Sequence, residues 1–221
     1  LRAGALDTSA VFDCSNADFG TFRIHNSEGH SYGPLNMVEA FAQSSNIYFA
    51  RAASRLDDQQ FCAALRDFGF GQRTRVPYGA EPAGLMSRPG GRSWSVRSKA
   101  TMAIGQEIAV TPLQLAMAAA AVANDGLLLA PRLVREVRDA DHSLRERSDR
   151  VTVRRVLSPE TARLVRLALA RAVGAGTGKL AAVPWTRVGG KTGTAQRAEG
   201  GRYAPGEYVC SFLGLVPAER P

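Results

Sequence analysis

A lysine stands between glycines and threonines near the end of the sequence, in the run VGGKTGTAQ, Val188–Gln196. Two kinds of site place a lysine in such a run. Gly-Lys-Thr ends the phosphate-binding loop of nucleotide-binding proteins, whereas Lys-Thr-Gly lies on an active-site strand of enzymes that transfer acyl groups through a serine. The residues around Lys191 decide between phosphate binding and acyl transfer.

The spacing excludes a phosphate-binding loop. Such a loop needs a glycine five residues before its Gly-Lys pair, because the backbone N–H groups in between wrap the phosphate. Trp185 occupies this position before Gly190. In a second partial match, GAGTGKL, Val173 replaces the first glycine and Leu180 replaces the magnesium-binding hydroxyl. The sequence therefore does not predict nucleotide binding.

A Ser-x-Asn pair, Ser44 and Asn46, lies in the polar break of QSSNIYF between two apolar-periodic segments. Alone, such a break is typical of a helix cap. It is followed, in order, by IGQEIAVTPLQLA and by the run around Lys191. With these three segments the chain resembles the transpeptidase domain of class B penicillin-binding proteins. The likeness extends from GHSYGPLNMVEAFAQSSNIYF to SFLGLVP and so covers nearly the whole chain.

The resemblance implies an α+β fold of the penicillin-binding protein and β-lactamase type, a helical region beside an antiparallel sheet with the active site between them. It implies a peptidoglycan D,D-transpeptidase that binds stem peptides ending in D-Ala-D-Ala, is acylated by β-lactam antibiotics and uses no cofactor or metal. It also implies a place on the extracytoplasmic face of the bacterial membrane, beside other membrane proteins of cell-wall synthesis.

Acyl transfer explains the residue types. The reaction needs a nucleophilic serine, a proton relay to the leaving amine and donors for the oxyanion. By the resemblance, Ser44 is the relay hydroxyl, Lys191 directs its ammonium at Ser44 and Asn46 holds the donor amide.

Four further residues are assigned to substrate binding by the resemblance. Thr192 and Thr194 offer hydroxyls to the terminal carboxylate, and the backbone N–H of Thr194 is one oxyanion donor. Gly193 leaves the strand without a side chain where a peptide could lie alongside as an added strand. Gln106 matches a family position beside the site, although a plain turn residue before the next helix is an equally open interpretation.

The nucleophile motif of the family, Ser-x-x-Lys, is missing. Valine, glycine and valine stand three residues before Lys99, Lys179 and Lys191, the three lysines of the chain. We therefore expect residues 1–221 to be one partial transpeptidase domain. The nucleophile segment and a membrane anchor are expected before Leu1, and a further strand and helix after Pro221. The alternative is a non-catalytic relative that binds or senses ligands without a nucleophile.

Another mechanism must be weighed, since GHSYG, Gly29–Gly33, satisfies the Gly-x-Ser-x-Gly of α/β-hydrolases, with Ser31 as nucleophile. Such an elbow needs a strand running into the first glycine and a helix directly after the last. Polar residues precede Gly29 and Pro34 follows Gly33. The pattern favours a loop serine.

Hydrophobic periodicity and cap signals predict the elements that position these residues. Helices are expected over 35–43, 46–56 and 57–71, over 111–126 with Thr111 as N-cap, and from Ser158 to about Val173. Residues 73–97 read as an extended loop. Strands are expected over 131–137 and 150–157, around a polar turn, and over 185–196 and 207–216, which a glycine-rich turn joins as a hairpin.

Composition excludes several classes of function. The 221 residues are 45% hydrophobic and 22% charged, as in an ordinary globular domain. The net charge is +8, but even the most basic stretch, 132–155, alternates arginines with acids and has no aromatic residue, so nucleic-acid binding has little support. Cys14, Cys62 and Cys210 lie far apart, so no zinc cluster is encoded, and Cys210, in an apolar run, is expected to be buried.

Overall fold

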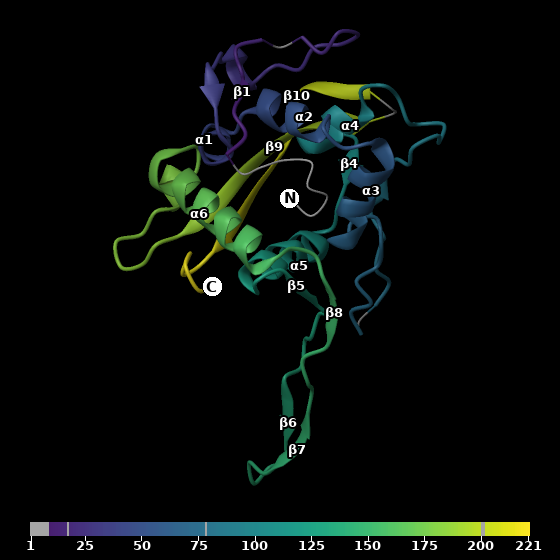
Figure 1. Ribbon diagram of the computed structural model, residues 1–221. Coiled ribbons are helices and arrows are strands. Elements are labelled where there is room, and N and C mark those ends of the chain that lie inside the picture. The colour runs from purple at the N-terminus through teal and green to yellow at the C-terminus, as the bar shows by residue number, and fades with distance from the viewer. Residues whose placement is uncertain (1–8, 17, 78, 200–201) are drawn as a thin grey trace.

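The computed structural model describes residues 9–16, 18–77, 79–199 and 202–221 (Figure 1). Its first elements are a short antiparallel pair, β1 (Phe12–Asp13) with β2 (Pro34–Leu35), and a 3-10 turn, η1 (Ser27–Gly29), between them. Leu1, where the expected upstream segment would join, lies outside the described residues.

Three short helices follow where the periodicity predicts them: α1 (Met37–Gln43), α2 (Asn46–Ala53) and α3 (Asp58–Asp67). Each begins at a side-chain cap. Asn36 forms a capping box with Glu39, and Asp57 forms one with Gln60. These boxes satisfy N–H groups that the first turn of a helix leaves unpaired. The helices are predictable because their start signals are local.

A fourth helix, α4 (Ser98–Ala103), lies just beyond the predicted loop and was not expected. It has only six residues and no side-chain cap, and two of its buried residues are Ser98 and Thr101. Their hydroxyls donate to the Glu107 carboxylate at 2.7 and 2.8 Å. The helix therefore depends on a partner later in the chain, which apolar periodicity does not show.

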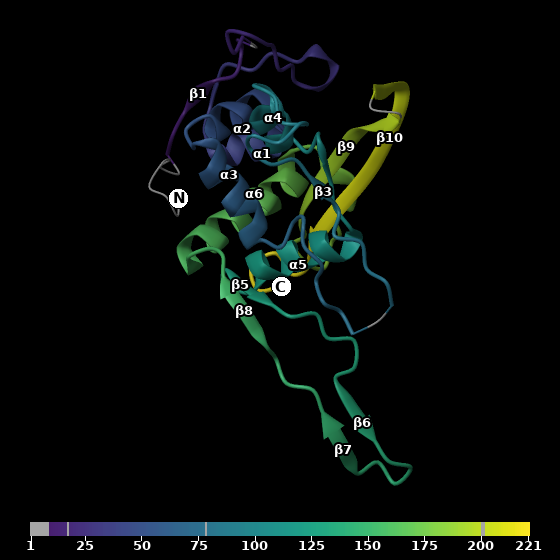
Figure 2. The same cartoon turned by 90° about the vertical axis from the view of Figure 1, so that its right-hand side faces the viewer.

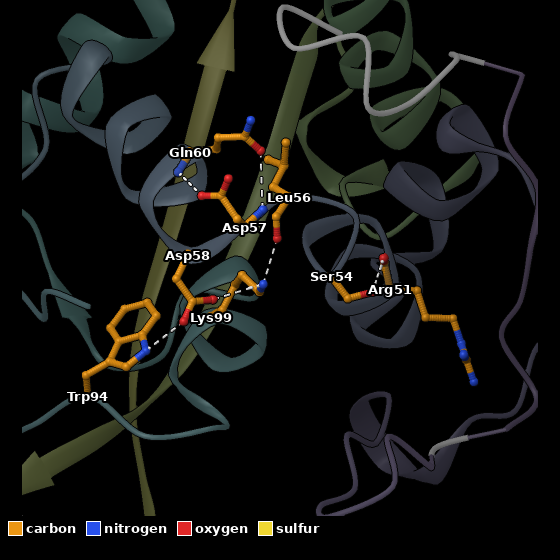
Figure 3. A network of polar contacts seen from close by, with 8 residues as sticks. All are labelled: Arg51, Ser54, Leu56, Asp57, Asp58, Gln60, Trp94 and Lys99. Carbon is orange, nitrogen blue, oxygen red and sulfur yellow. Dashed lines mark hydrogen bonds and ion pairs between the residues drawn. The ribbon is translucent and has the colours of Figure 1, made fainter. Parts of the chain in front are cut away.

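Asp58, at the start of α3, connects α3 to α4 (Figure 3). Its carboxylate accepts from Trp94 Nε1 at 3.0 Å and pairs with Lys99 Nζ at 2.9 Å. Lys99 Nζ also donates to the Leu56 carbonyl at 2.7 Å. Thus Lys99 has a structural role between two helices.

Helix α5 (Pro112–Ala123) has the predicted Thr111 cap but ends before the predicted Gly126. Asn124 caps it, and the chain turns at Gly126, where φ is +84°. A Cβ there would lie 2.1 Å from the Leu157 carbonyl oxygen, so only glycine fits this crossing of two segments. The Gly126 N–H also donates to the Ala121 carbonyl at 2.8 Å, so this glycine serves both the end of α5 and the close packing against Leu157.

The strands between α5 and α6 agree only in part with the prediction. Strand β5 (Leu127–Leu129) pairs with β8 (Thr152–Arg155), and β6 (Glu136–Arg138) pairs with β7 (Leu144–Arg147). The expected strand 150–157 contains β8, whereas 131–137 overlaps only the start of β6. Strands β6 and β7 form an arm that projects from the rest of the chain (Figure 2). Because the arm does not bury one face against the body, the sequence pattern does not fix its register. A further pair, β3 (Leu85–Met86) with β4 (Ile108–Ala109), joins the loop to the segment before α5.

Helix α6 (Pro159–Ala175) starts at the predicted Ser158 cap and packs against both α1 and the last hairpin. That hairpin consists of β9 (Gly189–Glu199) and β10 (Arg202–Leu215), paired antiparallel with Thr192 opposite Phe212. Its turn, at residues 200–201, lies outside the described residues. The 3-10 turn η2 (Lys179–Ala181) connects α6 to β9. In Figure 1, α6 lies between α1 and the hairpin, which gives the predicted α+β arrangement.

Cys210 is exposed, which corrects the prediction of a buried side chain. Side chains of a strand alternate between faces, and Cys210 shares its face with Phe212, which is also exposed. Gly189 instead contacts Leu169 and Ala170 of α6, so α6 covers the opposite face. An unbroken apolar run therefore did not mean burial on both faces.

Within the described residues, no helix has the length and apolar character needed to cross a membrane. The same part of the chain contains no group of three or more histidine, cysteine or acidic residues arranged to hold a metal ion.

Gly176 tests the contact between α6 and α1. A Cβ at this position would lie 2.3 Å from the Ala42 carbonyl oxygen and 2.8 Å from that of Ala172. Gly176→Ala should therefore lower the free energy of unfolding by about 1–3 kcal/mol through overpacking. Urea unfolding of the chain measures this.

The matched control is Gly174→Ala, since nothing lies within 4 Å of its added Cβ and Gly174 is inside α6. That change should be neutral or stabilise by about 0.5–1 kcal/mol. Equal effects of the two substitutions would contradict the close approach of α6 to α1.

Candidate active site

Ser44 occupies a two-residue break between α1 and α2. It is the C-cap of α1 and has a left-handed backbone, with φ 54° and ψ 44°. Its N–H group bonds back to the last turn of α1, and the Ser45 N–H donates to the Ala40 carbonyl at 3.0 Å. The backbone of the break is thus tied to α1, and the Ser44 hydroxyl is only partly buried.

Asn46 begins α2, two residues after Ser44. Its Nδ2 donates to the His25 carbonyl at 2.9 Å. This bond orients the side-chain amide and leaves Oδ1 to accept from another group. Among the described residues no hydrogen bond joins Asn46 to Lys191. The two are related through Ser44, which is two residues before Asn46 and binds Lys191.

Lys191 lies on β9 and reaches the break between the helices. Its Nζ donates to Ser44 Oγ at 2.6 Å and to the Thr192 carbonyl at 2.9 Å. The first contact joins residues 147 positions apart. Burial lowers the pKa of the Lys191 ammonium below its ordinary value, because a charged amine loses hydration there. The hydrogen bond expected between these two side chains is present.

The Thr192 hydroxyl has a hydrogen-bond partner outside the predicted site residues. Its Oγ1 lies 2.9 Å from Oγ1 of Thr177, in the loop after α6. The Thr177 N–H donates to the Ala42 carbonyl at 3.1 Å, so this loop contacts the end of α1 and β9 together. Sequence reasoning missed Thr177, since it treated GAGTGKL only as a failed phosphate loop.

Gly193 lies opposite Ser211 of the neighbouring strand. A Cβ on Gly193 would lie 2.5 Å from Ser211 Oγ on β10, a contact that rotation of the exposed serine side chain relieves. Thr194 is exposed and, because side chains alternate, shares a face with Thr192. In the part of the chain that is described, β9 pairs only with β10, so its other edge is unpaired.

Gln106 stands apart from these residues. Its backbone N–H donates to the Thr101 carbonyl at 2.9 Å, and the adjoining Glu107, with φ 54°, is held by α4 through its carboxylate. Its side chain makes no hydrogen bond to Ser44, Asn46 or Lys191 within the described ranges. The geometry therefore leaves the turn interpretation of Gln106 open.

Neither Ser31 nor the cavity beside α6 forms an alternative active site with the predicted residues. Ser31 is exposed and follows the 3-10 turn η1, while β2 comes after it, so the strand, sharp turn and helix of a hydrolase elbow are absent here. A cavity of about 570 Å³ lies between α6 and residues 182–188 and contains none of the predicted site residues.

Residues 1–221 match the family described as the penicillin binding protein transpeptidase domain. The chain belongs to this family.

Two curated relatives show the extent of the likeness. Stage V sporulation protein D of Bacillus subtilis is 33% identical over 218 residues, covering 98% of this chain and 33% of that protein. Penicillin-binding protein PbpB of Mycolicibacterium smegmatis is 35% identical over 211 residues, covering 91% of this chain and 32% of that protein. The chain thus spans about a third of the length of these relatives.

Solved structures agree with the fold. The crystal structure of penicillin-binding protein 3 from Mycobacterium tuberculosis in complex with aztreonam matches with a TM-score of 0.84 and 32% identity. The match covers 99% of this chain and 50% of that one. The α+β fold predicted from the motifs is therefore confirmed.

The lowered pKa of Lys191 predicts a pH dependence of stability. As pH rises above the folded-state pKa, the folded chain releases this proton while the unfolded chain still holds it. The free energy of unfolding should then increase with pH up to the ordinary lysine pKa. Urea unfolding from about pH 8 to pH 10 should show the wild type gaining stability relative to Lys191→Met.

Lys179→Met is the control, since Lys179 is exposed. Its stability should run parallel to that of the wild type over the same range. Parallel curves for Lys191→Met as well would contradict the burial of the Lys191 ammonium.

Proposed function

We propose that this chain is the part of a peptidoglycan D,D-transpeptidase that carries the proton relay and the substrate strand. The observation that carries the proposal is the hydrogen bond from Lys191 Nζ to Ser44 Oγ at 2.6 Å. Support comes from relatives named probable peptidoglycan D,D-transpeptidase PenA, such as that of Neisseria gonorrhoeae, 31% identical over 222 residues. The substrates are stem peptides ending in D-Ala-D-Ala, and β-lactams acylate the same site.

The relay follows from the donor directions at Ser44. A serine outside residues 1–221 gives its hydroxyl proton to the lysine of its Ser-x-x-Lys motif and adds to the carbonyl of the penultimate D-Ala, and the bond to the terminal D-Ala nitrogen then breaks. Ser44 gives its hydroxyl proton to this leaving nitrogen and takes one from the Lys191 ammonium. Burial makes that ammonium a stronger acid, which favours the transfer.

The substrate lies along the unpaired edge of β9. An extended peptide can add there as a strand, with main-chain hydrogen bonds to the edge. Thr192 and Thr194 offer hydroxyls from one face to the terminal carboxylate, and the Thr194 N–H is one donor to the oxyanion. Asn46 Oδ1, left open by the bond to His25, accepts the N–H of the donor peptide.

The location and partners of the whole protein follow from the same proposal. Peptidoglycan is crosslinked outside the cytoplasm, so we place the domain on the extracytoplasmic face of the cell membrane, anchored by a segment outside residues 1–221. Other membrane proteins of cell-wall synthesis are its protein partners. β-Lactam binding is supported by the complexes of the Mycobacterium tuberculosis protein with aztreonam and ampicillin.

Lys191→Ala in the full-length protein should slow acylation by a fluorescent penicillin about a hundredfold or more, the range of a positioned acid–base or electrostatic group. Lys191→Arg should recover only part of the rate, because guanidinium is larger and keeps its proton. Stopped-flow or gel-based labelling measures the rate, with Lys179→Ala as the unaffected control. An unchanged rate in Lys191→Ala would remove Lys191 from the mechanism.

The 221-residue chain by itself should form no covalent adduct with the same penicillin, because no serine in it has a lysine three residues later. The full-length protein should be labelled on a serine of a Ser-x-x-Lys motif encoded within about two dozen residues before Leu1. Mass spectrometry of the labelled peptide identifies the residue. A full-length protein without the motif and without labelling would favour the non-catalytic alternative, and an adduct on Ser31 would contradict the assigned nucleophile.

Gly193 offers a test that separates folding from substrate access. Gly193→Ala alone requires the exposed Ser211 hydroxyl to rotate away from the new Cβ, and adding Ser211→Ala removes this contact altogether. We expect the double variant to regain the melting temperature of Ser211→Ala but to acylate at least about tenfold more slowly, since the added methyl obstructs the bound peptide or lactam. Full recovery of the acylation rate would show that Gly193 serves β10 alone.

A further inference from the structure

The segment from His25 to His30 lies against the break that carries Ser44, and its centre is Asn26. Asn26 is buried, with 6% of its surface exposed, and is far from the break in sequence. Neither the motif pattern nor the proposed relay uses it. A buried polar side chain needs hydrogen-bond partners, and these partners show which parts of the structure Asn26 fixes.

Each polar atom of the Asn26 amide is bound. Oδ1 accepts from the Ser45 hydroxyl at 3.2 Å and from the Ile47 N–H at 3.3 Å. Nδ2 donates to the His30 carbonyl at 3.0 Å. The Ser45 hydroxyl, in turn, accepts from the Tyr48 N–H at 3.3 Å. Asn26 is therefore joined to Ser45, the residue between Ser44 and Asn46, and to Ile47 two residues later.

These bonds complete the start of α2. Ile47 and Tyr48 are the second and third residues of that helix, whose N–H groups have no partner within the helix. The Ser45 hydroxyl accepts from the Tyr48 N–H as the local cap, and Asn26 Oδ1 accepts from the Ile47 N–H. The start of α2 is thus fixed to the segment 25–30, with Asn46 held to the same segment through the His25 carbonyl.

The conformation of Ser44 requires such support. A left-handed backbone costs a residue other than glycine about 1–2 kcal/mol, and it persists only where the surroundings determine it. On one side, α1 holds Ser44 through its cap bonds. On the other side, Ser45 is fixed by Asn26. We propose that Asn26 is a positioning residue. By fixing Ser45 and the start of α2, it holds the Ser44 hydroxyl within hydrogen-bonding distance of Lys191 Nζ.

This inference rests on the proposed function, and two readouts separate it from a structural effect. In the full-length protein, Asn26→Ala should lower the rate constant of penicillin acylation by about tenfold to a hundredfold, the scale of a misplacement near 1 Å in a catalytic group. Asn26→Asp should give a rate between those of the wild type and Asn26→Ala, because it keeps the acceptor for Ser45 and Ile47 but replaces the donor to the His30 carbonyl with an oxygen. Rates are compared at the same interval below each melting temperature.

Asn36→Ala is the matched control, since it removes a comparable cap from the opposite end of α1, at a cost of about 1 kcal/mol, without touching the break. It should acylate like the wild type. Asn26→Ser replaces Asn26→Ala if the alanine variant does not fold, because the shorter hydroxyl cannot reach both of the groups that Oδ1 binds.

The second readout needs no nucleophile. The 221-residue chain has only three lysines, so NMR of lysine labelled with ¹³C at Cε resolves Lys191 with Lys99 and Lys179 as internal references. Asn26→Ala should raise the Lys191 pKa toward its ordinary value as Ser44 shifts and water enters, while Asn36→Ala should leave it unchanged. If the wild-type full-length protein is not acylated, the proposed function fails and this titration still decides the role of Asn26. Asn26→Ala matching Asn36→Ala in both readouts would overturn the inference.

Discussion

One hydrogen bond, from Lys191 Nζ to Ser44 Oγ, is the constraint on which the site depends. Its two residues belong to different parts of the fold, a helix break early in the chain and a strand near its end. Helix α6 packs against both α1 and β9 and so connects the two parts. The loop after α6 connects them a second time, through the contacts of Thr177 with Ala42 and Thr192. The distance between Lys191 and Ser44 therefore depends on how closely α6 approaches α1 and β9.

The site carries costs that the surrounding structure offsets. The Lys191 ammonium is partly buried and has a lowered pKa. Ser44 adopts a left-handed backbone conformation, which is unfavourable for a residue with a side chain. Caps of α1 and α2, together with the contacts of Asn26, hold the break in place. Such a concentration of strain and burial in one small region is expected where a protein positions groups for proton transfer.

The sequence predicts the elements whose signals are local and misses those that depend on distant partners. The Thr111 and Ser158 caps placed two of the helices, and the order of the Ser-x-Asn and Lys-Thr-Gly segments led to the family and the fold. Helix α4, the pairing of β5 with β8 and the exposure of Cys210 were missed or wrong, because each depends on which face another segment covers. Thr177 and Asn26 could not be found in the same way, since only the folded chain brings them to Ser44 and Thr192.

A crystal structure of the full-length protein acylated by a β-lactam would test the proposed relay. We predict an acyl bond to a serine outside residues 1–221, adjacent to Ser44, with Lys191 Nζ still within hydrogen-bonding distance of Ser44 Oγ. The carboxylate of the antibiotic should lie against the hydroxyls of Thr192 and Thr194. An antibiotic bonded elsewhere, or a Lys191 side chain turned away from Ser44, would contradict it.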